Sequence, residues 1–292
     1  MRRKNRFIFL FVTMLIVATT GCEKTEPSDE QNETDKTIDI VYLHHSTGRV
    51  VWEGKPSLLE KLGVGTDQPA IPAYLEKYND QYATDYQITA REFPAASPYG
   101  WNNYPYDYYN IWVKHGDEEY FQEEPTLKVL SEEYDVIVFK HCFPVSHMQQ
   151  GSSPGDPDSP DKTLMNYMAQ YALLKDKMHA YPNTKFLLWT GPALLQSHTN
   201  EREALITQEF YEWVKNTWDK PGDNIYLWDF RELETEGSLY LKPENAAGPD
   251  NSHPSYKFGQ AAANLFVQRL TDVIEDDGTN TERTGKRIND KQ

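Results

Sequence analysis

Residues 38–48 read IDIVYLHHSTG, an apolar run that ends in two histidines, a serine and a glycine. The apolar residues at 38–43 predict a buried strand, and the polar residues after them predict a tight turn into a helix. A serine in such a turn carries its hydroxyl at the carboxyl end of the sheet, and its backbone N–H can face a developing oxyanion. The stretch therefore indicates a first strand and a candidate nucleophile, Ser46.

Further strands and helices alternate along the rest of the chain. Strand-like apolar runs lie at residues 86–93, 135–140, 185–190 and 224–229, and amphipathic helical patterns lie at 58–62, 162–180, 201–218 and 255–274. Strands followed by helices at this spacing favour a parallel sheet that is covered on both faces. We expect an α/β domain over residues 37–275, a three-layer α/β/α flavodoxin-like sandwich with a mostly parallel five-stranded sheet.

The two ends differ from this domain in composition. Basic residues at 2–6, an apolar run at 7–18 and the sequence TTGC at 19–22 are the layout of a secretory signal. The apolar run is shorter than the roughly 20 residues of a membrane-spanning helix. The segment resembles a bacterial lipoprotein signal, which implies a signal peptide over 1–21 and lipidation of Cys22. An ordinary signal peptide with an incidental Cys22 is the alternative.

This layout predicts a location in the bacterial cell envelope. The lipid on Cys22 would hold the protein to the outer membrane, on its periplasmic side or at the cell surface, and would be its only membrane contact. Residues 22–36 and 276–292 lack large apolar runs, so we expect a disordered tether and a disordered tail.

Charge and cysteine content exclude several classes of protein. The 292 residues hold 29 Lys and Arg against 45 Asp and Glu, a formal net charge of −16. Nucleic acid is therefore not an expected partner, because binding its phosphates needs clustered basic residues. Two cysteines cannot build a disulfide scaffold, and a lipidated Cys22 would leave Cys142 without an intramolecular partner. We expect a monomer without a cofactor.

A second polar motif lies just before the last helical pattern. Residues 248–254 read GPDNSHP, with Pro254 suited to the first turn of a helix. A carboxylate at Asp250, three residues before His253, can hold the imidazole in the tautomer that accepts a serine proton. Ser46 and Asp250 also have a structural alternative as helix-capping residues.

The two motifs together resemble those of the SGNH, or GDSL-type, hydrolases. In that family a serine follows the first strand and a D-x-x-H motif precedes the C-terminal helix. The resemblance covers about residues 38–274. It implies a serine hydrolase without metal or organic cofactor, in which Ser46 is the nucleophile, His253 the general base and acid, and Asp250 the orienting carboxylate.

The sequence departs from that family at the positions that stabilise the oxyanion. His44 and His45 stand where the family has Gly-Asp, and residues 139–144, FKHCFP, replace its G-x-N-D motif. The candidate oxyanion donors are therefore the backbone of Ser46, Gly100, Lys140, His141, or an asparagine of the loop at 97–121.

Two insertions are expected at the carboxyl ends of the strands, where doubly wound folds bind ligands. Residues 97–121 are rich in aromatics and 149–161 in Gly, Pro, Ser and Asp, and they are candidates for a substrate wall and a lid. The candidate substrate-binding residues are Trp101, Asn102, Asn103 and Tyr104. The aromatic cluster could instead cap the sheet edge; its members are Trp101, Tyr104, Tyr106, Tyr108, Tyr109 and Trp112.

Three further interpretations stay open. His44, His45 and His141 could bind zinc, although their spacing matches no known motif. Cys142 could be a nucleophile or a small buried residue. The aspartates of the second insertion could bind calcium or face solvent; they are Asp156, Asp158 and Asp161.

The leading hypothesis is a serine esterase or acyl hydrolase that removes O-acyl groups from a carbohydrate. The ester follows from the family resemblance, and the carbohydrate from the aromatic loop and the envelope location. The partner would be an acylated small molecule or glycan. The alternative is a catalytically inactive, glycan-binding surface lipoprotein on the same fold.

Overall fold

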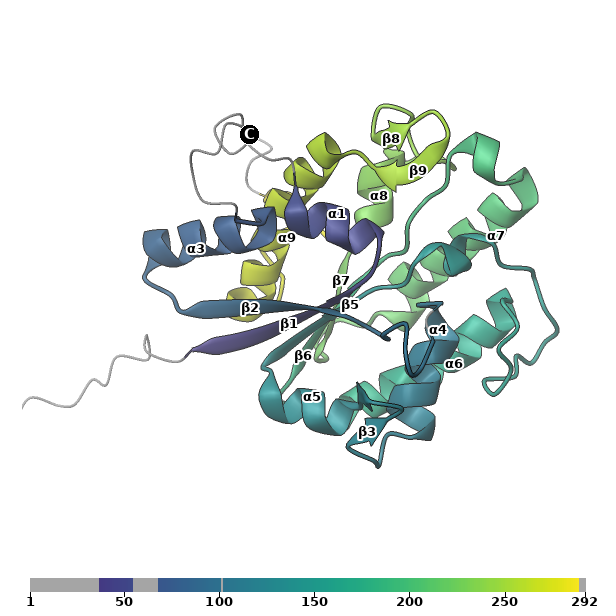
Figure 1. The fold of residues 1–292 in the computed structure, drawn as a ribbon, viewed down its shortest axis with the longest axis horizontal. Helices are drawn as coiled ribbons and strands as arrows, with labels where there is room; N and C mark the ends of the chain where they lie inside the picture. Colours follow the sequence, from purple (N-terminus) through teal and green to yellow (C-terminus); the bar gives the residue numbers. More distant parts are fainter. Residues whose placement is uncertain (1–36, 55–67, 101, 289–292) are drawn as a thin grey trace, which may run out of the picture. The chain divides into compact units, whose positions relative to one another are not determined.

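A parallel sheet of five strands forms the centre of the computed structural model, which describes residues 37–54, 68–100 and 102–288 (Figure 1). The strands stand in the order β2-β1-β5-β6-β7, and every neighbouring pair is parallel. Their bounds are β1 Ile38–His44, β2 Tyr86–Glu92, β5 Val136–Phe139, β6 Lys185–Trp189 and β7 Ile225–Trp228. The predicted flavodoxin-like sheet is confirmed.

Several predictions concern residues outside the described part of the chain. These are the signal peptide over 1–21, the lipidated Cys22, most of the tether, the helix at 58–62, and the substrate-binding role of Trp101.

Helices cover both faces of the sheet, as Figure 1 shows. One face packs against α1 (Thr47–Glu53), α3 (Ala70–Tyr82), α8 (Phe230–Thr235) and α9 (Tyr256–Asp276). The other packs against α4 (Pro105–Tyr108), the π-helix η2 (Tyr109–Lys114), α5 (Leu127–Glu133), α6 (Leu164–His179), α7 (Glu201–Trp213) and the π-helix η5 (Val214–Trp218).

The short elements complete the loops. They are β3 (Tyr120–Phe121), β4 (Glu124–Pro125), the 3₁₀ helices η3 (Phe143–Ser146) and η4 (Gln196–His198), and the hairpin strands β8 (Ala246–Gly248) and β9 (Asn251–Pro254).

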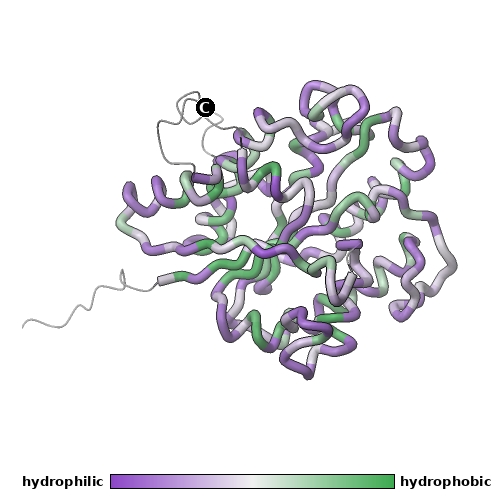
Figure 2. The backbone as a smooth tube through the Cα atoms, viewed as in Figure 1, coloured by the Kyte–Doolittle hydropathy of each residue, from purple (hydrophilic) through white to green (hydrophobic). Residues whose placement is uncertain are grey.

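The central strands β1, β5 and β6 are largely apolar because both of their faces are buried, whereas the edge strand β2 is mostly exposed and carries polar residues. In β1, Val41 and Leu43 belong to one core, whereas Ile40 and Tyr42 belong to the other. Successive side chains of a strand point to opposite faces, so a strand between two helical layers needs an uninterrupted apolar run. Figure 2 shows this run as hydrophobic strands inside a more hydrophilic exterior.

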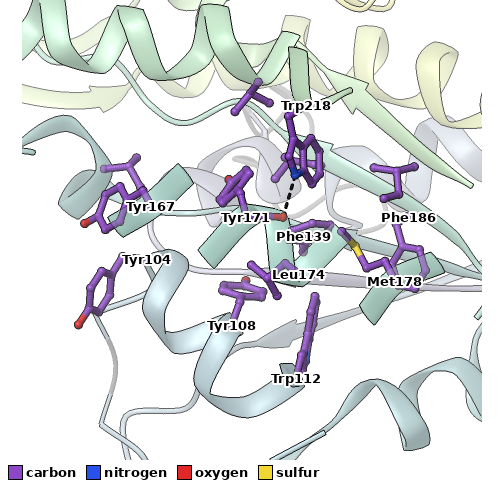
Figure 3. Close-up of a cluster of buried hydrophobic side chains, with 14 of the residues drawn as sticks. Tyr104, Tyr108, Trp112, Phe139, Tyr167, Tyr171, Leu174, Met178, Phe186 and Trp218 are labelled. Atoms are coloured by element: carbon purple, nitrogen blue, oxygen red, sulfur yellow. Dashed lines mark hydrogen bonds between the residues drawn. The ribbon is translucent and has the colours of Figure 1, made fainter. Parts of the chain in front are cut away.

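The aromatic insertion at 97–121 is largely part of the core. Tyr108 and Trp112 are 0% exposed, with ring centroids 4.8 Å apart, and both pack on Phe139 of β5 (Figure 3). Tyr104 and Tyr109 are also buried. The cluster therefore covers the sheet, which favours the structural alternative for these rings over sugar stacking.

The C-terminal segment is ordered through residue 288, so the prediction of a disordered tail from 276 is wrong for these residues. The Arg269 guanidinium on α9 donates to Gly278 O at 2.6 Å and to Thr281 Oγ1 at 3.0 Å. The Trp228 Nε1–H donates to Thr284 O at 3.2 Å. Polar composition suggested disorder, but these polar groups pair with buried ones.

Removing residues 277–292 is expected to destabilise the protein by about 3 kcal/mol or more, because the buried Arg269 and Asp272 would lose their hydrogen bonds to residues 278–281. Asp272 Oδ2 accepts the Thr281 N–H at 2.7 Å. Urea unfolding followed by tryptophan fluorescence measures the change. Removing only 289–292 is the control, and equal midpoints for both truncations would contradict the prediction.

No helix in the described ranges is long and apolar enough to cross a membrane.

Candidate active site

Ser46 lies in the turn between β1 and α1. Its backbone φ of 43° and ψ of −101° fall in a region that side chains rarely adopt, and such strain costs about 1–3 kcal/mol. Ser46 precedes the first residue of α1, but its side chain makes no capping hydrogen bond. The hydroxyl is therefore not used as a helix cap, which disfavours the structural alternative for this serine.

The turn that carries Ser46 is closely packed at Gly48. A Cβ at Gly48 would lie 2.7 Å from His44 Cβ and 2.9 Å from Lys140 Cδ. The Tyr42 hydroxyl donates to Gly48 O at 3.0 Å, and the Gly48 N–H donates to His45 O at 2.8 Å. Only glycine fits here without displacing its neighbours, so the turn holds Ser46 in one position.

The fold brings His253 to Ser46 across 207 residues of sequence. His253 belongs to β9, and its Nε2 is hydrogen-bonded to Ser46 Oγ. Helix α9 begins directly afterwards, with Ser255 Oγ accepting the Phe258 N–H at 3.2 Å. The pairing of Ser46 and His253 thus has the geometry of a nucleophile and its base.

The partner at the other ring nitrogen of His253 is Asn251. Its Oδ1 lies 2.9 Å from His253 Nδ1 and accepts the His253 backbone N–H at 3.0 Å. Since a backbone N–H can only donate, the shared atom must be the amide oxygen. Nδ1 must then carry a proton, which leaves Nε2 of the neutral ring to accept from Ser46.

The predicted role of Asp250 is wrong in this structure. Asp250 is exposed in the turn between β8 and β9, and no hydrogen bond in the described part of the chain joins it to His253. Residues three apart, such as Asp250 and His253, would come together if the motif formed a single turn. Because β9 is extended, residues two apart share a face, so Asn251 and not Asp250 reaches the ring.

Two features of the surroundings act on the pKa of His253: burial and a neighbouring cation. Partial burial lowers the pKa of His253 below its usual 6.5, and the positive charge of Lys140 lowers it further. The Phe143 ring stands edge-on to the imidazole, with centroids 5.0 Å apart. The neutral ring, which can accept a proton, therefore persists at lower pH than it would in an unperturbed histidine.

Lys140 packs against the turn that carries Ser46 and is 1% exposed. Its Nζ lies 3.4 Å from His45 O and 3.1 Å from Cys142 Sγ. Burial, followed by the charge of Lys140, lowers the pKa of His44 to about 3. The Lys140 ammonium is thus within hydrogen-bond distance of the His45 carbonyl and the Cys142 sulfur, and its predicted role as an oxyanion donor stays a prediction.

The other predicted oxyanion donors differ in position. Burial, then the charge of Lys140, holds the pKa of His141 far below its usual value, and the ring packs 4.7 Å from Tyr108. The His141 side chain is 0% exposed, so it lies in the core, which disfavours its predicted role as a donor. Gly100 lies in an exposed turn with φ of +81°. Its role and that of the Ser46 backbone N–H stay predictions.

Two of the four predicted substrate-binding residues, Asn103 and Tyr104, make structural contacts. Asn103 is 0% exposed, its side-chain Nδ2 donates to Phe93 O at 2.6 Å, and its backbone carbonyl accepts the Cys142 N–H at 2.8 Å. The buried Tyr104 donates to Pro160 O at 3.3 Å. These bonds join the aromatic insertion to the strand ends and to the second insertion. Of the predicted residues, Asn102 is exposed.

No group of three potential metal ligands occurs within residues 37–54, 68–100 and 102–288. His44 lies over Tyr42 with centroids 5.0 Å apart, whereas His45 Nε2 lies 2.6 Å from Pro94 O. The histidines therefore face different surroundings.

The other open interpretations concern the second insertion and the free cysteine. Asp158 forms an ion pair with Lys114 at 2.9 Å, and Cys142 is buried. These contacts support neither a zinc nor a calcium site.

No family model matches the chain, and no curated protein matches it.

Three solved structures resemble the chain at low identity. The periplasmic domain of a Salmonella ser. Paratyphi A lipopolysaccharide acetyltransferase is 13% identical, with a TM-score of 0.41, covering 82% of this chain and 85% of that one. An acetyl xylan esterase variant from Geobacillus stearothermophilus is 16% identical, with a TM-score of 0.42 and coverages of 80% and 94%. A carbohydrate esterase is 12% identical, with a TM-score of 0.34 and coverages of 81% and 65%. Similarity at this level carries no functional conclusion for this chain.

Proposed function

We propose that the protein is a serine hydrolase of SGNH-like type that cleaves O-acyl esters. The observation that supports the proposal is the hydrogen bond between Ser46 Oγ and His253 Nε2. The strained turn supports it further, because stored backbone strain concentrates at functional positions. A serine that served only the fold would have no need of a distant histidine at its hydroxyl.

In this reaction His253 Nε2 takes the Ser46 proton while Oγ attacks the acyl carbonyl carbon. The tetrahedral intermediate collapses as the His253 imidazolium returns that proton to the leaving alcohol, so Ser46 holds the acyl group. A water then gives a proton to His253 and attacks the acyl carbon; the second tetrahedral intermediate releases the acid as the His253 imidazolium returns that proton to Ser46 Oγ, which restores both residues. The Ser46 backbone N–H is the oxyanion donor that we propose.

We propose a short O-acyl ester of a carbohydrate as the substrate class. Phe143 beside His253 offers an apolar surface for a small acyl chain. The formal net charge of −16 disfavours polyanionic substrates and is compatible with a neutral sugar ester. Lipid anchoring through Cys22 and a location in the cell envelope belong to the same proposal.

Labelling with a fluorophosphonate probe tests the proposal, with peptide mapping of the modified residue. We expect the probe on Ser46, together with turnover of 4-nitrophenyl acetate and of an acetylated oligosaccharide. Denatured protein is the control for non-specific labelling. An unlabelled folded protein that binds glycans saturably would instead support the inactive, glycan-binding alternative.

A further inference from the structure

We propose that Asn251, in place of a carboxylate, is the positioning residue for His253. The inference rests on the proposed function and deepens it, because it assigns the group that orients the base. The resulting arrangement is Ser46, His253 and a neutral amide.

The geometry of β9 carries the proposal. Asn251 and His253 are two residues apart on an extended strand, so their side chains lie on one face. The Asn251 Oδ1 meets both the ring Nδ1 and the backbone N–H of His253, at 2.9 and 3.0 Å. The backbone donor fixes which amide atom is oxygen, and that oxygen selects the Nδ1–H tautomer.

The groups around His253 come from several elements. Ser46 approaches from the β1–α1 turn, and the aromatic Phe143 comes from η3. Lys140, from the end of β5, is the charged group that acts on the ring. His198 of η4 is bonded through Nδ1 to Ser252 Oγ at 2.7 Å, next to His253 in sequence. The partner of Nδ1 is Asn251, an uncharged group.

A neutral partner changes the chemistry in a defined way. The amide orients the ring but adds no negative charge to stabilise the imidazolium that forms during attack. Burial and Lys140 already lower the pKa of His253. The base should therefore stay deprotonated, and the enzyme active, at pH values where a histidine paired with a carboxylate would be protonated.

The experiment compares three variants of the full chain. Asn251→Ala removes the positioning group, Asn251→Asp replaces it with a carboxylate, and Asp250→Ala is the matched control on the adjacent residue. Histidine-selective ¹⁵N NMR reports the tautomer and titration of His253 without substrate. The pH profile of kcat/KM for 4-nitrophenyl acetate reports catalysis.

We expect Asn251→Ala to lower kcat by about 100-fold, the low end of a general-base contribution, with KM unchanged. In NMR its His253 should lose the pure Nδ1–H signature. Asn251→Asp should restore kcat at alkaline pH and move both the acid limb and the NMR titration to higher pH. Asp250→Ala should match wild type within about 2-fold, as expected for an exposed residue outside the site.

The opposite pattern would overturn the proposal. If Asp250→Ala lost activity and changed the His253 tautomer while Asn251→Ala changed neither, Asp250 would be the orienting group. If the wild-type protein hydrolysed no ester, the proposed function would fail. The ¹⁵N NMR measurements would still show whether Asn251 or Asp250 sets the tautomer of His253. A folding defect alone would lower activity without moving the pH profile of Asn251→Asp.

Discussion

Replacing Ser46 by alanine is expected to lower kcat/KM for ester hydrolysis by about 10⁶-fold, the loss seen when a serine nucleophile is removed. The variant keeps His253 but has no Oγ to form the acyl intermediate. Steady-state kinetics with 4-nitrophenyl acetate measures the loss, and fluorophosphonate labelling should vanish with it. Activity within about 10-fold of wild type would show that Ser46 is not the nucleophile.

Ser46→Gly is the matched control, because it separates chemistry from backbone strain. Ser46 has φ of 43°, which glycine adopts freely. Relief of about 1–3 kcal/mol of strain exceeds the roughly 0.5–1 kcal/mol entropic cost of a glycine. We therefore expect Ser46→Gly to be inactive yet more stable than Ser46→Ala in urea unfolding. Equal stabilities would mean that the turn is not strained.

The largest expected pH effect on stability comes from Glu234 of α8. Its side chain is 0% exposed, and Oε2 accepts the Ala193 N–H at 2.7 Å. Oε1 has no hydrogen-bond partner in the described residues. Burial outweighs the nearby cations and raises the pKa of Glu234 from 4.5 to about 8. The folded protein thus holds a proton that the unfolded chain releases above pH 4.5.

The sign of the effect follows from this difference. Because the folded state binds more protons, stability falls as pH rises from 4.5 to about 8, by about 1.4 kcal/mol per pH unit over that window. Glu234→Gln keeps an acceptor for Ala193 and does not titrate. Urea unfolding at pH 5, 6, 7 and 8 should show this slope in wild type and its loss in the variant.

The slope of stability against pH is compared, and not the stability itself, because Glu234→Gln also buries amide N–H donors that have no partner. Those donors lower the stability of the variant for a reason unrelated to titration. Thr207→Ser, a conservative change at another buried position, is a suitable reference. Identical slopes in wild type and Glu234→Gln would show that Glu234 is ionised in the folded protein throughout this range.

The sheet could be predicted from the sequence because strands buried on both faces leave uninterrupted apolar runs. Ser46 and His253 could be predicted as a pair, because each stands in a distinctive motif next to a predicted element. The role of Asn251 could not, because it depends on whether residues 251–254 are extended or turned. The local sequence is compatible with both, and the hairpin with β8 decides between them.

The wrong prediction of a disordered tail and the open alternatives for the aromatic cluster have a shared cause. Aromatic residues such as Tyr108 look the same in sequence whether they stack on a ligand or fill a core. Residues 277–288 look polar enough for disorder, but their partners, Arg269 and Asp272, are buried on α9. In both cases long-range packing decides, and the composition of a segment does not report it.

The contacts of helix α9 affect how far the proposed base, His253, is preorganised. Helix α9 begins at Tyr256, directly after its Ser255 cap, and further along the helix Arg269 Nε donates to Leu227 O of β7 at 3.0 Å. A helix that is capped at its start and bonded to the sheet limits the movement of β9, the strand that carries the proposed base. His253 should therefore sample few orientations before substrate arrives, which reduces the entropy lost on reaching the transition state.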